Sequence, residues 1–393
     1  MLGLPYFLDK LNQAHAYGQL CRVDLRSGCN DDHLHSCQGA QVVYRASSVL
    51  FLYFALMAAA GGAVHYIYAN LWPLKFLAVA GCVGGAMFLP DPALFGVYAE
   101  IARVLSLLWM LFQGFLVLDF AHDIHDAIGA KADEQDSISG SSGSIFSSGW
   151  RILYLVLSAA CLAATGVGLG ALFTGHVGCV LGATLVGITV SVGVVTTVLS
   201  LLENVGIGLL PPSILFAHST FLCWYALSSH PELSCNPWAG CDALAAEGKT
   251  VGAAISLALL LCAVAWITWH GEKILELFGV EGEESVSLLS PSAGPNINST
   301  SSSVDAGDEE AVESRPSRVV YCSAMACASS FAAMAMTSWA RTNGSPESVG
   351  GSGTPLETLW IKVITQWICL VLQMRILWVT YQDNRSSSSY RSF

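Results

Sequence analysis

Residues 94–121 read LFGVYAEIARVLSLLWMLFQGFLVLDFA, a stretch of 28 residues with only three charged side chains. At about 1.5 Å per residue, a helix of this length extends for roughly 42 Å, which exceeds the roughly 30 Å of hydrocarbon in a bilayer. Such a helix must tilt within the membrane or protrude from it. The stretch therefore predicts a long, oblique transmembrane helix.

The rest of the 393-residue chain has the same character, with 53% hydrophobic and 12% charged residues. Soluble domains carry about a quarter charged residues. Because none of the apolar runs shows the alternating pattern of an outer-membrane barrel, the predicted fold class is all-α, a polytopic transmembrane helical bundle. Apolar runs of transmembrane length predict nine spans, at residues 43–68, 72–89, 94–121, 150–173, 177–202, 209–227, 250–270, 319–340 and 358–381.

The charge balance and the absence of several motifs limit the functions open to this chain. It has 17 basic and 29 acidic residues, a formal net charge of −12, and no basic cluster. Since phosphate binding needs clustered lysine and arginine, we expect no nucleic-acid partner. The phosphate-binding loop, the Gly-x-Ser-x-Gly elbow and the His-Glu-x-x-His motif do not occur in the sequence. We therefore expect neither enzymatic activity nor a bound cofactor.

The basic residues of the loops favour one orientation in the membrane. Lys249 and Arg341 are the only basic residues in the loops after spans two, four, six and eight. The loops on the opposite side, together with the C-terminal tail, contain more basic residues. The positive-inside rule places this second set in the cytosol, although the basic residues of the N-terminal segment favour the reverse. The cysteines of the loops agree with the first orientation, because they lie on the predicted outer side, where disulfides form: Cys21, Cys29, Cys37, Cys235 and Cys241.

Two pairs of these cysteines are candidates for disulfide bonds. Cys29 and Cys37 enclose two histidines in a spacing that also suits zinc, but on an oxidising face we expect a bond between them or with Cys21. Cys235 and Cys241 lie six residues apart in the loop after the sixth span, and we predict that they bond with each other.

Composition divides the chain into five segments. Serine, glycine and acidic residues dominate two of its loops, and such composition buries too little apolar surface to offset the entropy of ordering. The segments are a polar, cysteine-containing outer or lumenal segment at 1–42, a membrane bundle of spans 1–7 at 43–270 with a disordered cytosolic loop at 122–149, an acidic, serine-rich, disordered cytosolic loop at 271–318, the last two spans at 319–381, and a cytosolic tail at 382–393.

Few polar side chains interrupt the spans, and these are the candidates for a lipid headgroup pathway. Glu100 and Arg103 are three residues apart, so they form either a salt bridge or part of a polar lining. Lys362, Gln366 and Gln373 fall within about 40° of one another on a helical wheel. Their stripe suits a groove that solvates a headgroup, and it suits hydrogen bonding between helices equally well.

Asp119 is a further candidate, because it begins a series with His122, Asp123, His125 and Asp126. Histidine and carboxylate side chains three residues apart on a helix can ligate a metal, which would suit a metal-dependent lipid-modifying enzyme. The predicted helix reaches the cytosolic interface here, where polar residues are common. We therefore expect no metal at this position and retain Asp119 as a pathway residue.

Short motifs along the chain resemble those of the serine incorporator (Serinc) family. Because they touch most predicted spans in the family's order, the resemblance is specific. The motifs are VVYR at 42–45, WPLKFL at 72–77, FLP at 88–90, FGVY at 95–98, DFAH at 119–122, LLPPS at 209–213, WYALSSHP at 224–231, SCNP at 234–237, AMTSW at 335–339, WIK at 360–362 and WIC at 367–369.

The resemblance implies a bundle of two subdomains crossed by one long oblique helix, with lipid-accessible clefts between them. It also implies ten spans, with one helix ahead of the VVYR motif. Only a polar stretch precedes that motif here. We therefore expect that the first transmembrane helix is lacking, either because the gene model is truncated or because the helix is absent.

The resemblance also implies that the protein handles lipids. The leading hypothesis is ATP-independent scrambling of phospholipids, such as phosphatidylserine, between leaflets. The alternative is a serine carrier or scaffold that promotes phosphatidylserine and sphingolipid synthesis. The expected partners are membrane phospholipids, lipid-synthesis enzymes for the alternative, and a second copy of the chain in a homo-oligomer. The expected location is the endoplasmic reticulum, Golgi, endosome or plasma membrane.

Overall fold

The computed structural model describes residues 34–60, 72–89, 92–139, 149–176, 178–202, 208–230, 235–236, 242–269, 315–339 and 355–390. Within these ranges the secondary structure is helical throughout and contains no strand. The helices are α2 (Leu34–Ala60), α4 (Trp72–Ala86), α5 (Pro92–Ser139), α6 (Gly149–Gly175), α7 (Val180–Ser200), α8 (Leu210–Leu227), α9 (Asp242–Trp269), α11 (Arg315–Met336) and α12 (Pro355–Tyr390).

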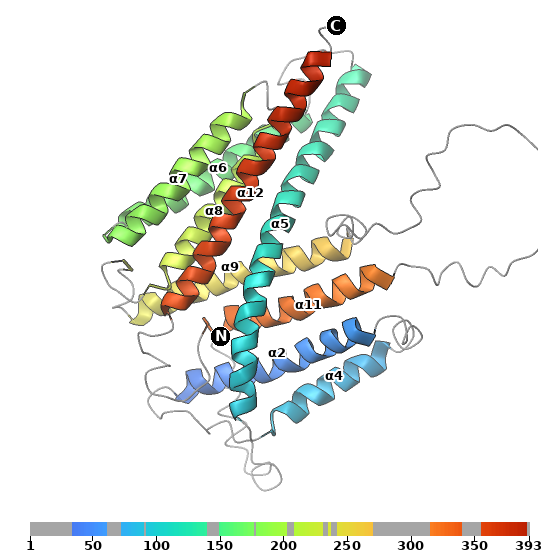
Figure 1. Cartoon of the computed structure of the whole chain (residues 1–393), viewed down its shortest axis with the longest axis vertical. Helices are drawn as coiled ribbons and strands as arrows, with labels where there is room; N and C mark the ends of the chain where they lie inside the picture. The colour runs from blue at the N-terminus through green and yellow to red at the C-terminus, as the bar shows by residue number, and fades with distance from the viewer. Residues whose placement is uncertain are drawn as a thin grey trace, which may run out of the picture.

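Helix α5 organises the arrangement of the others. It has 48 residues and runs along most of the length of the molecule, with α12 beside its C-terminal half (Figure 1). Helices α6, α7 and α8 pack on the side of α12, and α2, α4, α9 and α11 form a second group that meets α5 toward its N-terminal half. The structure thus contains two groups of helices crossed by one long helix, as the predicted fold requires.

Each group has its own hydrophobic core. Trp109 and Met334 belong to a buried cluster that α2, α5, α9 and α11 share. Leu172 and Val363 belong to a second cluster that α6, α7, α8 and α12 share. Because α5 contributes to the first core and also contacts α12 and α8, it joins the two groups.

Glycine allows close approach at two helix crossings. A Cβ atom on Gly114 of α5 would overlap the Sγ of Cys369 on α12, and one on Gly193 of α7 would overlap the ring of Phe216 on α8. Small residues at such positions let membrane helices pack backbone to backbone. The positions of α12 and α8 therefore depend on glycine in their neighbours.

The start of α8 is fixed from outside the helix. The hydroxyl of Tyr154 on α6 accepts hydrogen bonds from the amides of Leu209 and Leu210 at 2.8 and 2.9 Å. These amides have no acceptor within the helix, because the first N–H groups of a helix lack intrahelical partners. Gly208, with φ of +80°, makes the turn that brings them to the hydroxyl.

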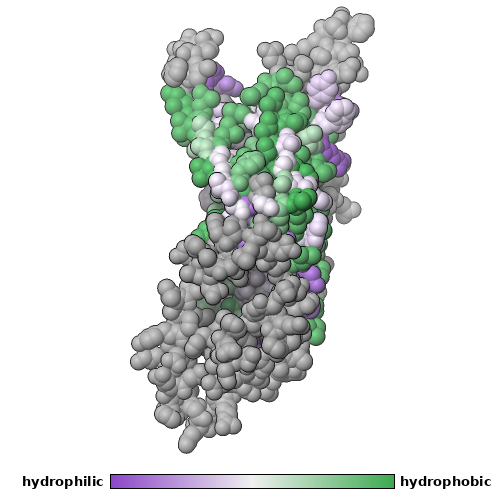
Figure 2. Space-filling model, turned by 90° about the vertical axis from the view of Figure 1, so that its left-hand side faces the viewer, coloured by the Kyte–Doolittle hydropathy of each residue, from purple (hydrophilic) through white to green (hydrophobic). Residues whose placement is uncertain are grey.

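Each of the nine predicted spans overlaps one helix, and seven of the described helices are long and apolar enough to cross a membrane. Helix α4 is a shorter apolar helix, and the 18 residues of α8 are not among the seven. The face in Figure 2 is largely hydrophobic over the described helices. Large apolar side chains such as Phe76, Val167 and Leu261 are more than 65% exposed, as expected in helices that face lipid.

Several predicted boundaries are wrong. Residues 122–139 continue α5 and do not form a disordered loop. This extension is held against α6, because Arg151 pairs with Asp136 and Lys131 lies 4.5 Å above the ring of Trp150.

Other helices also extend beyond their predicted spans, among them α9, which begins at Asp242. Helix α2 begins at Leu34, within the segment predicted to be a polar tail, α11 begins at Arg315, and α12 continues to Tyr390. The predicted disorder at 140–148 and 271–314 lies outside the described residues.

A candidate polar site along α12

Lys362 lies near the start of α12, with 2% of its surface exposed. Its Nζ donates hydrogen bonds to the carbonyl oxygen of Tyr225 at 3.0 Å and to the hydroxyl of Ser229 at 2.6 Å. It also lies 3.3 Å from the centroid of the Tyr225 ring. The Tyr225 carbonyl belongs to the last turn of α8, where the helix dipole places partial negative charge. Within the described ranges, no carboxylate forms an ion pair with Lys362.

Trp339 completes the surroundings of Lys362. Its ring centroid lies 5.9 Å from the Lys362 Nζ, and its indole N–H donates to the hydroxyl of Tyr225 at 3.2 Å. Ser338 and Trp339 have φ values of 52° and 63°, in the left-handed region that residues other than glycine rarely adopt. Strained backbone of this kind persists only where its surroundings enforce it, and it occurs preferentially at functional sites.

Contacts with α2 and α11 stabilise this strained turn. The amide of Trp339 donates to the carbonyl of Met334 at 2.9 Å, which closes the end of α11. The Thr337 and Tyr44 hydroxyls are hydrogen-bonded at 3.0 Å. The turn therefore brings together residues of the VVYR, AMTSW, WYALSSHP and WIK motifs.

Gln366 and Gln373 continue the polar stripe along α12, and both are buried, with 1% and 4% of their surface exposed. The Gln366 amide nitrogen donates to the hydroxyl of Thr189 on α7, but its carbonyl oxygen has no hydrogen-bond partner. Neither amide atom of Gln373 has a partner among the described residues. We call Lys362, Gln366 and Gln373 the polar row.

The polar row is closed in this structure. Lys362 faces α8 and Gln366 faces α7, so hydrogen bonding between helices is present at these two residues. An open, solvated groove is not present at these three residues.

Glu100 and Arg103 form the salt bridge that their spacing suggested. The Arg103 Nη1 lies 3.0 Å from a carboxylate oxygen of Glu100 and 3.7 Å from one of Glu357 on α12. The Arg103 side chain is 8% exposed, and those of Glu100 and Glu357 are about half exposed. This cluster links α5 to the start of α12, near the polar row.

Asp119 is placed away from the polar row, between α5 and α9. It accepts a hydrogen bond from the indole N–H of Trp266 at 3.0 Å, and the rings of Phe120 and Trp266 pack edge to face at 4.9 Å. In the part of the chain that the structure describes, no group of three or more His, Cys, Asp or Glu side chains could hold a metal.

The disulfide prediction needs a correction, because Cys235 bonds with Cys179 and not with Cys241. Cys179 lies at the start of α7, and its Cα is 5.0 Å from that of Cys235. Sequence proximity suggested Cys241, but the fold brings the α6–α7 and α8–α9 connections together. Both connections lie on the side predicted to be outer, where a disulfide is chemically expected. Cys241, Cys29 and the side chain of Cys37 lie outside what the structure describes.

His176 lies just before this disulfide and is completely buried. Burial lowers the pKa of its imidazole, and a hydrogen bond with the Ala171 backbone opposes that effect. The carbonyl of His176 also lies where a side chain at Gly182 would begin, so glycine is required there.

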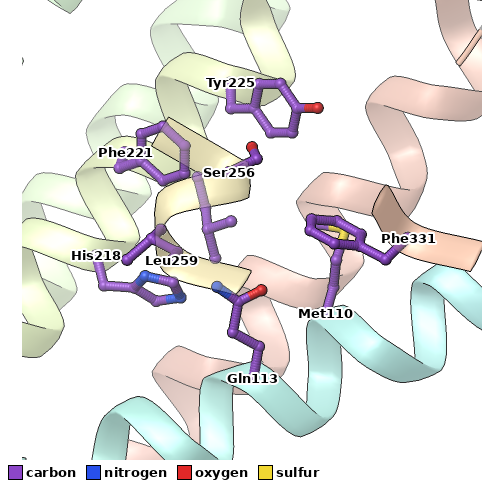
Figure 3. Close-up of a pocket in the computed structure, with 9 residues that line it drawn as sticks. Met110, Gln113, His218, Phe221, Tyr225, Ser256, Leu259 and Phe331 are labelled. Atoms are coloured by element: carbon purple, nitrogen blue, oxygen red, sulfur yellow. The ribbon is translucent and has the colours of Figure 1, made fainter. Parts of the chain in front are cut away.

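A pocket that Tyr225 helps to line lies between α5, α8, α9 and α11 (Figure 3). Gln113 and His218 point into the same space, and Ser256 contacts the Tyr225 hydroxyl. Among its described lining residues none is Asp, Glu, Lys or Arg. The lining consists of Met110, Gln113, His218, Phe221, Leu222, Tyr225, Ser256, Leu259 and Phe331.

Sequence reasoning missed the partners of the candidate residues. Tyr225, Ser229 and Trp339 lie in the motifs shared with the family, but their sequence positions do not link them to Lys362, and Thr189 and Glu357 lie outside those motifs. The signal that could have identified these partners is the recurrence of polar and aromatic residues within the motifs. Their convergence on Lys362 depends on how α8, α11 and α12 pack, which helical periodicity does not specify.

These helices, the lipid-facing surface and the buried polar row define a multi-pass helical membrane protein. The family model described as serine incorporator (Serinc) matches residues 4–380. The chain therefore belongs to the serine incorporator family.

Named relatives carry the same description. Serine incorporator 2 of Homo sapiens is 31% identical over 173 residues, which cover 43% of this chain and 36% of the human protein. A probable serine incorporator of Dictyostelium discoideum is 26% identical over 216 residues, covering 51% of this chain and 50% of the relative. Serine incorporator 3 of Bos taurus is 21% identical over 345 residues, covering 78% and 70%. The chain thus spans about half or less of the length of the first two relatives.

Proposed function

We propose that this protein lets phospholipids, such as phosphatidylserine, exchange between leaflets without ATP, and that their headgroups pass along the polar row of α12. The observation that carries this proposal is the set of unpartnered amide atoms within a membrane bundle: the Gln366 carbonyl oxygen and both amide atoms of Gln373. A buried amide without a partner costs roughly 1–3 kcal/mol by mutational measures. A ligand that forms hydrogen bonds with these amide atoms offsets that cost.

The chemistry of a phospholipid headgroup matches these groups. Its phosphate oxygens accept hydrogen bonds from the Gln373 amide nitrogen and the Lys362 ammonium, and an ammonium or hydroxyl donates to glutamine carbonyl oxygens. From Lys362 to Gln373 is a rise of about 16 Å, roughly half the hydrocarbon thickness. A headgroup on this row is therefore accompanied by polar groups over about half of its path, while its acyl chains remain in the bilayer.

Passage requires α12 to separate from α7 and α8, because these helices cover the row. The hydrogen bonds that close it are few: one from Gln366 to Thr189 and two from Lys362 to the end of α8. On the other side α12 contacts α5 at the Gly114–Cys369 crossing. We therefore infer that α12 moves relative to α7 and α8 when the path opens.

The names of the relatives favour a second candidate, a carrier or scaffold that supplies serine to lipid-synthesis enzymes. The pocket of Figure 3 has a volume of only about 10 Å³, which is room for about one water molecule and not for free serine. Free serine is a zwitterion, and binding both of its charges in a buried site calls for charged or strongly dipolar partners. The described lining of this pocket contains no carboxylate, lysine or arginine, so the pocket offers no charged partner for either end of serine.

The test is leaflet exchange of fluorescent phosphatidylserine and phosphatidylcholine in proteoliposomes without nucleotide. The parent chain is compared with a variant carrying Lys362→Met, Gln366→Leu and Gln373→Leu, which keeps side-chain size and removes polarity. Thr184→Val is the matched control, because Thr184 is exposed on α7 and bonds only its own helix. Circular dichroism and gel filtration establish that each protein is folded.

We expect rapid exchange by the parent and the control, and exchange by the triple variant that is at least about tenfold slower, since about 1.4 kcal/mol of added barrier gives that factor. A folded parent that exchanges lipids no faster than protein-free vesicles contradicts the proposal. Serine uptake, or association with a lipid-synthesis enzyme, then supports the second candidate. We propose an endomembrane or plasma-membrane location for either activity.

A further inference from the structure

The surroundings of Lys362 form a binding site for an ammonium group. The site has an aromatic face from Tyr225 at 3.3 Å, a second from Trp339 at 5.9 Å, a carbonyl oxygen at 3.0 Å and the Ser229 hydroxyl at 2.6 Å. Aromatic faces and oxygen acceptors together are the elements with which proteins bind alkylammonium ligands. We call this set of groups the ammonium cage.

The walls of the ammonium cage are held by contacts that do not involve Lys362. The Tyr225 ring stacks on Phe221, with centroids 5.7 Å apart and planes 8° apart. The Tyr225 hydroxyl is held by the indole N–H of Trp339, whose own position is fixed by the turn after α11. The cage therefore keeps its shape when the Lys362 side chain leaves.

The electrostatic potential in the cage also persists without Lys362. The Tyr225 carbonyl lies at the negative end of α8, and it accepts hydrogen bonds from the Ser228 and Ser229 hydroxyls at 3.0 and 3.2 Å. The helix end, the Ser229 hydroxyl oxygen and two π faces attract a cation, and within the described residues no carboxylate pairs with the present occupant. An emptied cage therefore draws in another ammonium group.

We propose that the ammonium cage binds the ammonium of a phospholipid headgroup, and that Lys362 is a tethered competitor that keeps the cage filled when no lipid is present. This inference rests on the proposed function and specifies which headgroups enter the polar row, namely those with an ammonium group. The flexible four-carbon stem of lysine lets its ammonium leave and return. Headgroups with a primary or quaternary ammonium occupy the cage, and headgroups that lack one, such as phosphatidylglycerol, do not.

The first test measures ammonium binding without any lipid exchange. Full-length Lys362→Ala protein in detergent is heated in ethylammonium chloride or in sodium chloride of equal ionic strength. We expect ethylammonium to raise its Tm by about 3 °C more than sodium does, because a ligand that binds only the folded state stabilises it. The parent, whose cage is filled, and Lys75→Ala, which changes a lysine on α4, show no such difference. Adding Ser229→Ala to Lys362→Ala reduces the gain, because it removes one acceptor.

The second test asks whether the cage distinguishes headgroups. Dihexanoyl phosphatidylethanolamine and dihexanoyl phosphatidylglycerol are added to the same proteins below their critical micelle concentrations. Phosphatidylethanolamine stabilises Lys362→Ala more than the parent, and phosphatidylglycerol affects both proteins equally. Equal effects of the two lipids on Lys362→Ala overturn the headgroup assignment.

The outcomes separate this inference from the proposed function. If Lys362→Ala responds no more to ethylammonium than to sodium, the cage is not an ammonium site, whatever the rate of lipid exchange. If it responds to ethylammonium and to phosphatidylethanolamine while the folded parent exchanges no lipid, the cage stands and the proposed function falls.

Discussion

Helices α5 and α12 lie side by side over much of their lengths, yet the charged side chains of α5 and the amide side chains of α12 differ in the partners they find (Figure 1). On α5, the charged groups at three levels have partners on other helices: Arg103 with Glu357, Asp119 with Trp266, and Asp136 with Arg151. Four buried nitrogen atoms of α5, two on Arg103 and one each on Trp109 and His125, have no hydrogen-bond partner among the described residues. On α12, hydrogen bonding decreases along the polar row from Lys362 to Gln366 to Gln373, which has none.

The difference assigns different roles to the two helices. Polar groups of α5 pair with groups on α6, α9 and α12. These contacts hold α5 in a fixed position relative to both groups of helices. Buried polar groups without partners weaken the hold of α12 on its neighbours, because each group gains a partner only when water or a headgroup reaches it. Because the Gln373 amide has no partner and Gln366 has only one, we propose that α12 is the element that opens.

The largest effect on stability is expected where α12 is anchored. Trp339→Ala removes a large side chain that is 2% exposed and holds Tyr225, so we expect a loss of about 3 kcal/mol in the free energy of unfolding. Denaturant unfolding in mixed micelles measures it. The matched control is Trp269→Ala, because Trp269 is 87% exposed. Equal losses in the two variants would show that the turn after α11 does not anchor α12.

The crossing of the two helices is the next point to test. Gly114→Val places a side chain where Cys369 already lies, so it forces α5 and α12 apart at a cost of about 2 kcal/mol. Adding Cys369→Ala recovers part of this loss, because it removes the overlapping Sγ. Gly166→Val on α6 is the control, since a Cβ there meets open space. No recovery in the double variant would contradict the close crossing.

A partnered group on α5 gives a smaller loss. Asp119→Leu leaves the indole N–H of Trp266 without its acceptor and lowers the free energy of unfolding by about 1–2 kcal/mol. In the double variant with Trp266→Phe the two effects are not additive, because both changes remove the same hydrogen bond. Strict additivity would mean that the α5–α9 contact contributes nothing.

The smallest change has the opposite sign. Gln373→Leu removes two unpartnered polar atoms from a buried position and raises the free energy of unfolding by about 1 kcal/mol. The same variant slows lipid exchange, so stability and activity move in opposite directions. Gln382→Leu, at an exposed position of α12, leaves both unchanged. A loss of stability in Gln373→Leu would show that the amide has a partner.

The sequence predicted the fold class and a helix at each of the nine apolar runs, seven of which are long and apolar enough to cross a membrane, because apolar runs of membrane length have few alternative structures. It did not predict that α5 continues to Ser139. Composition indicated disorder at 122–149, but the contacts of Asp136 and Lys131 with α6 depend on a neighbour that lies beyond a loop. Tertiary contacts of this kind leave no local signal.

The candidate site was predictable in part. The wheel positions of Lys362, Gln366 and Gln373 placed them on one face, and helix geometry alone ensures that. Whether that face is open or covered depends on α7 and α8, and the structure covers it. The bond between Cys179 and Cys235 was missed for a similar reason, because 56 residues separate them in sequence and only the packing of α6 to α8 brings them together.

The opening of α12 is tested most directly by comparing two native cysteines that are similarly buried. Cys223 on α8 is 0% exposed and contacts Thr189 and Gln366 at the polar row, and Cys322 on α11 is 3% exposed in the other group of helices. The unmodified protein in proteoliposomes is treated with a small, charged methanethiosulfonate reagent, and peptide mass spectrometry measures modification at each site over time. If α12 opens from α7 and α8, Cys223 reacts at least about tenfold faster than Cys322, because only its surroundings become hydrated. Equal rates of modification at the two cysteines would contradict the opening of α12 from α7 and α8.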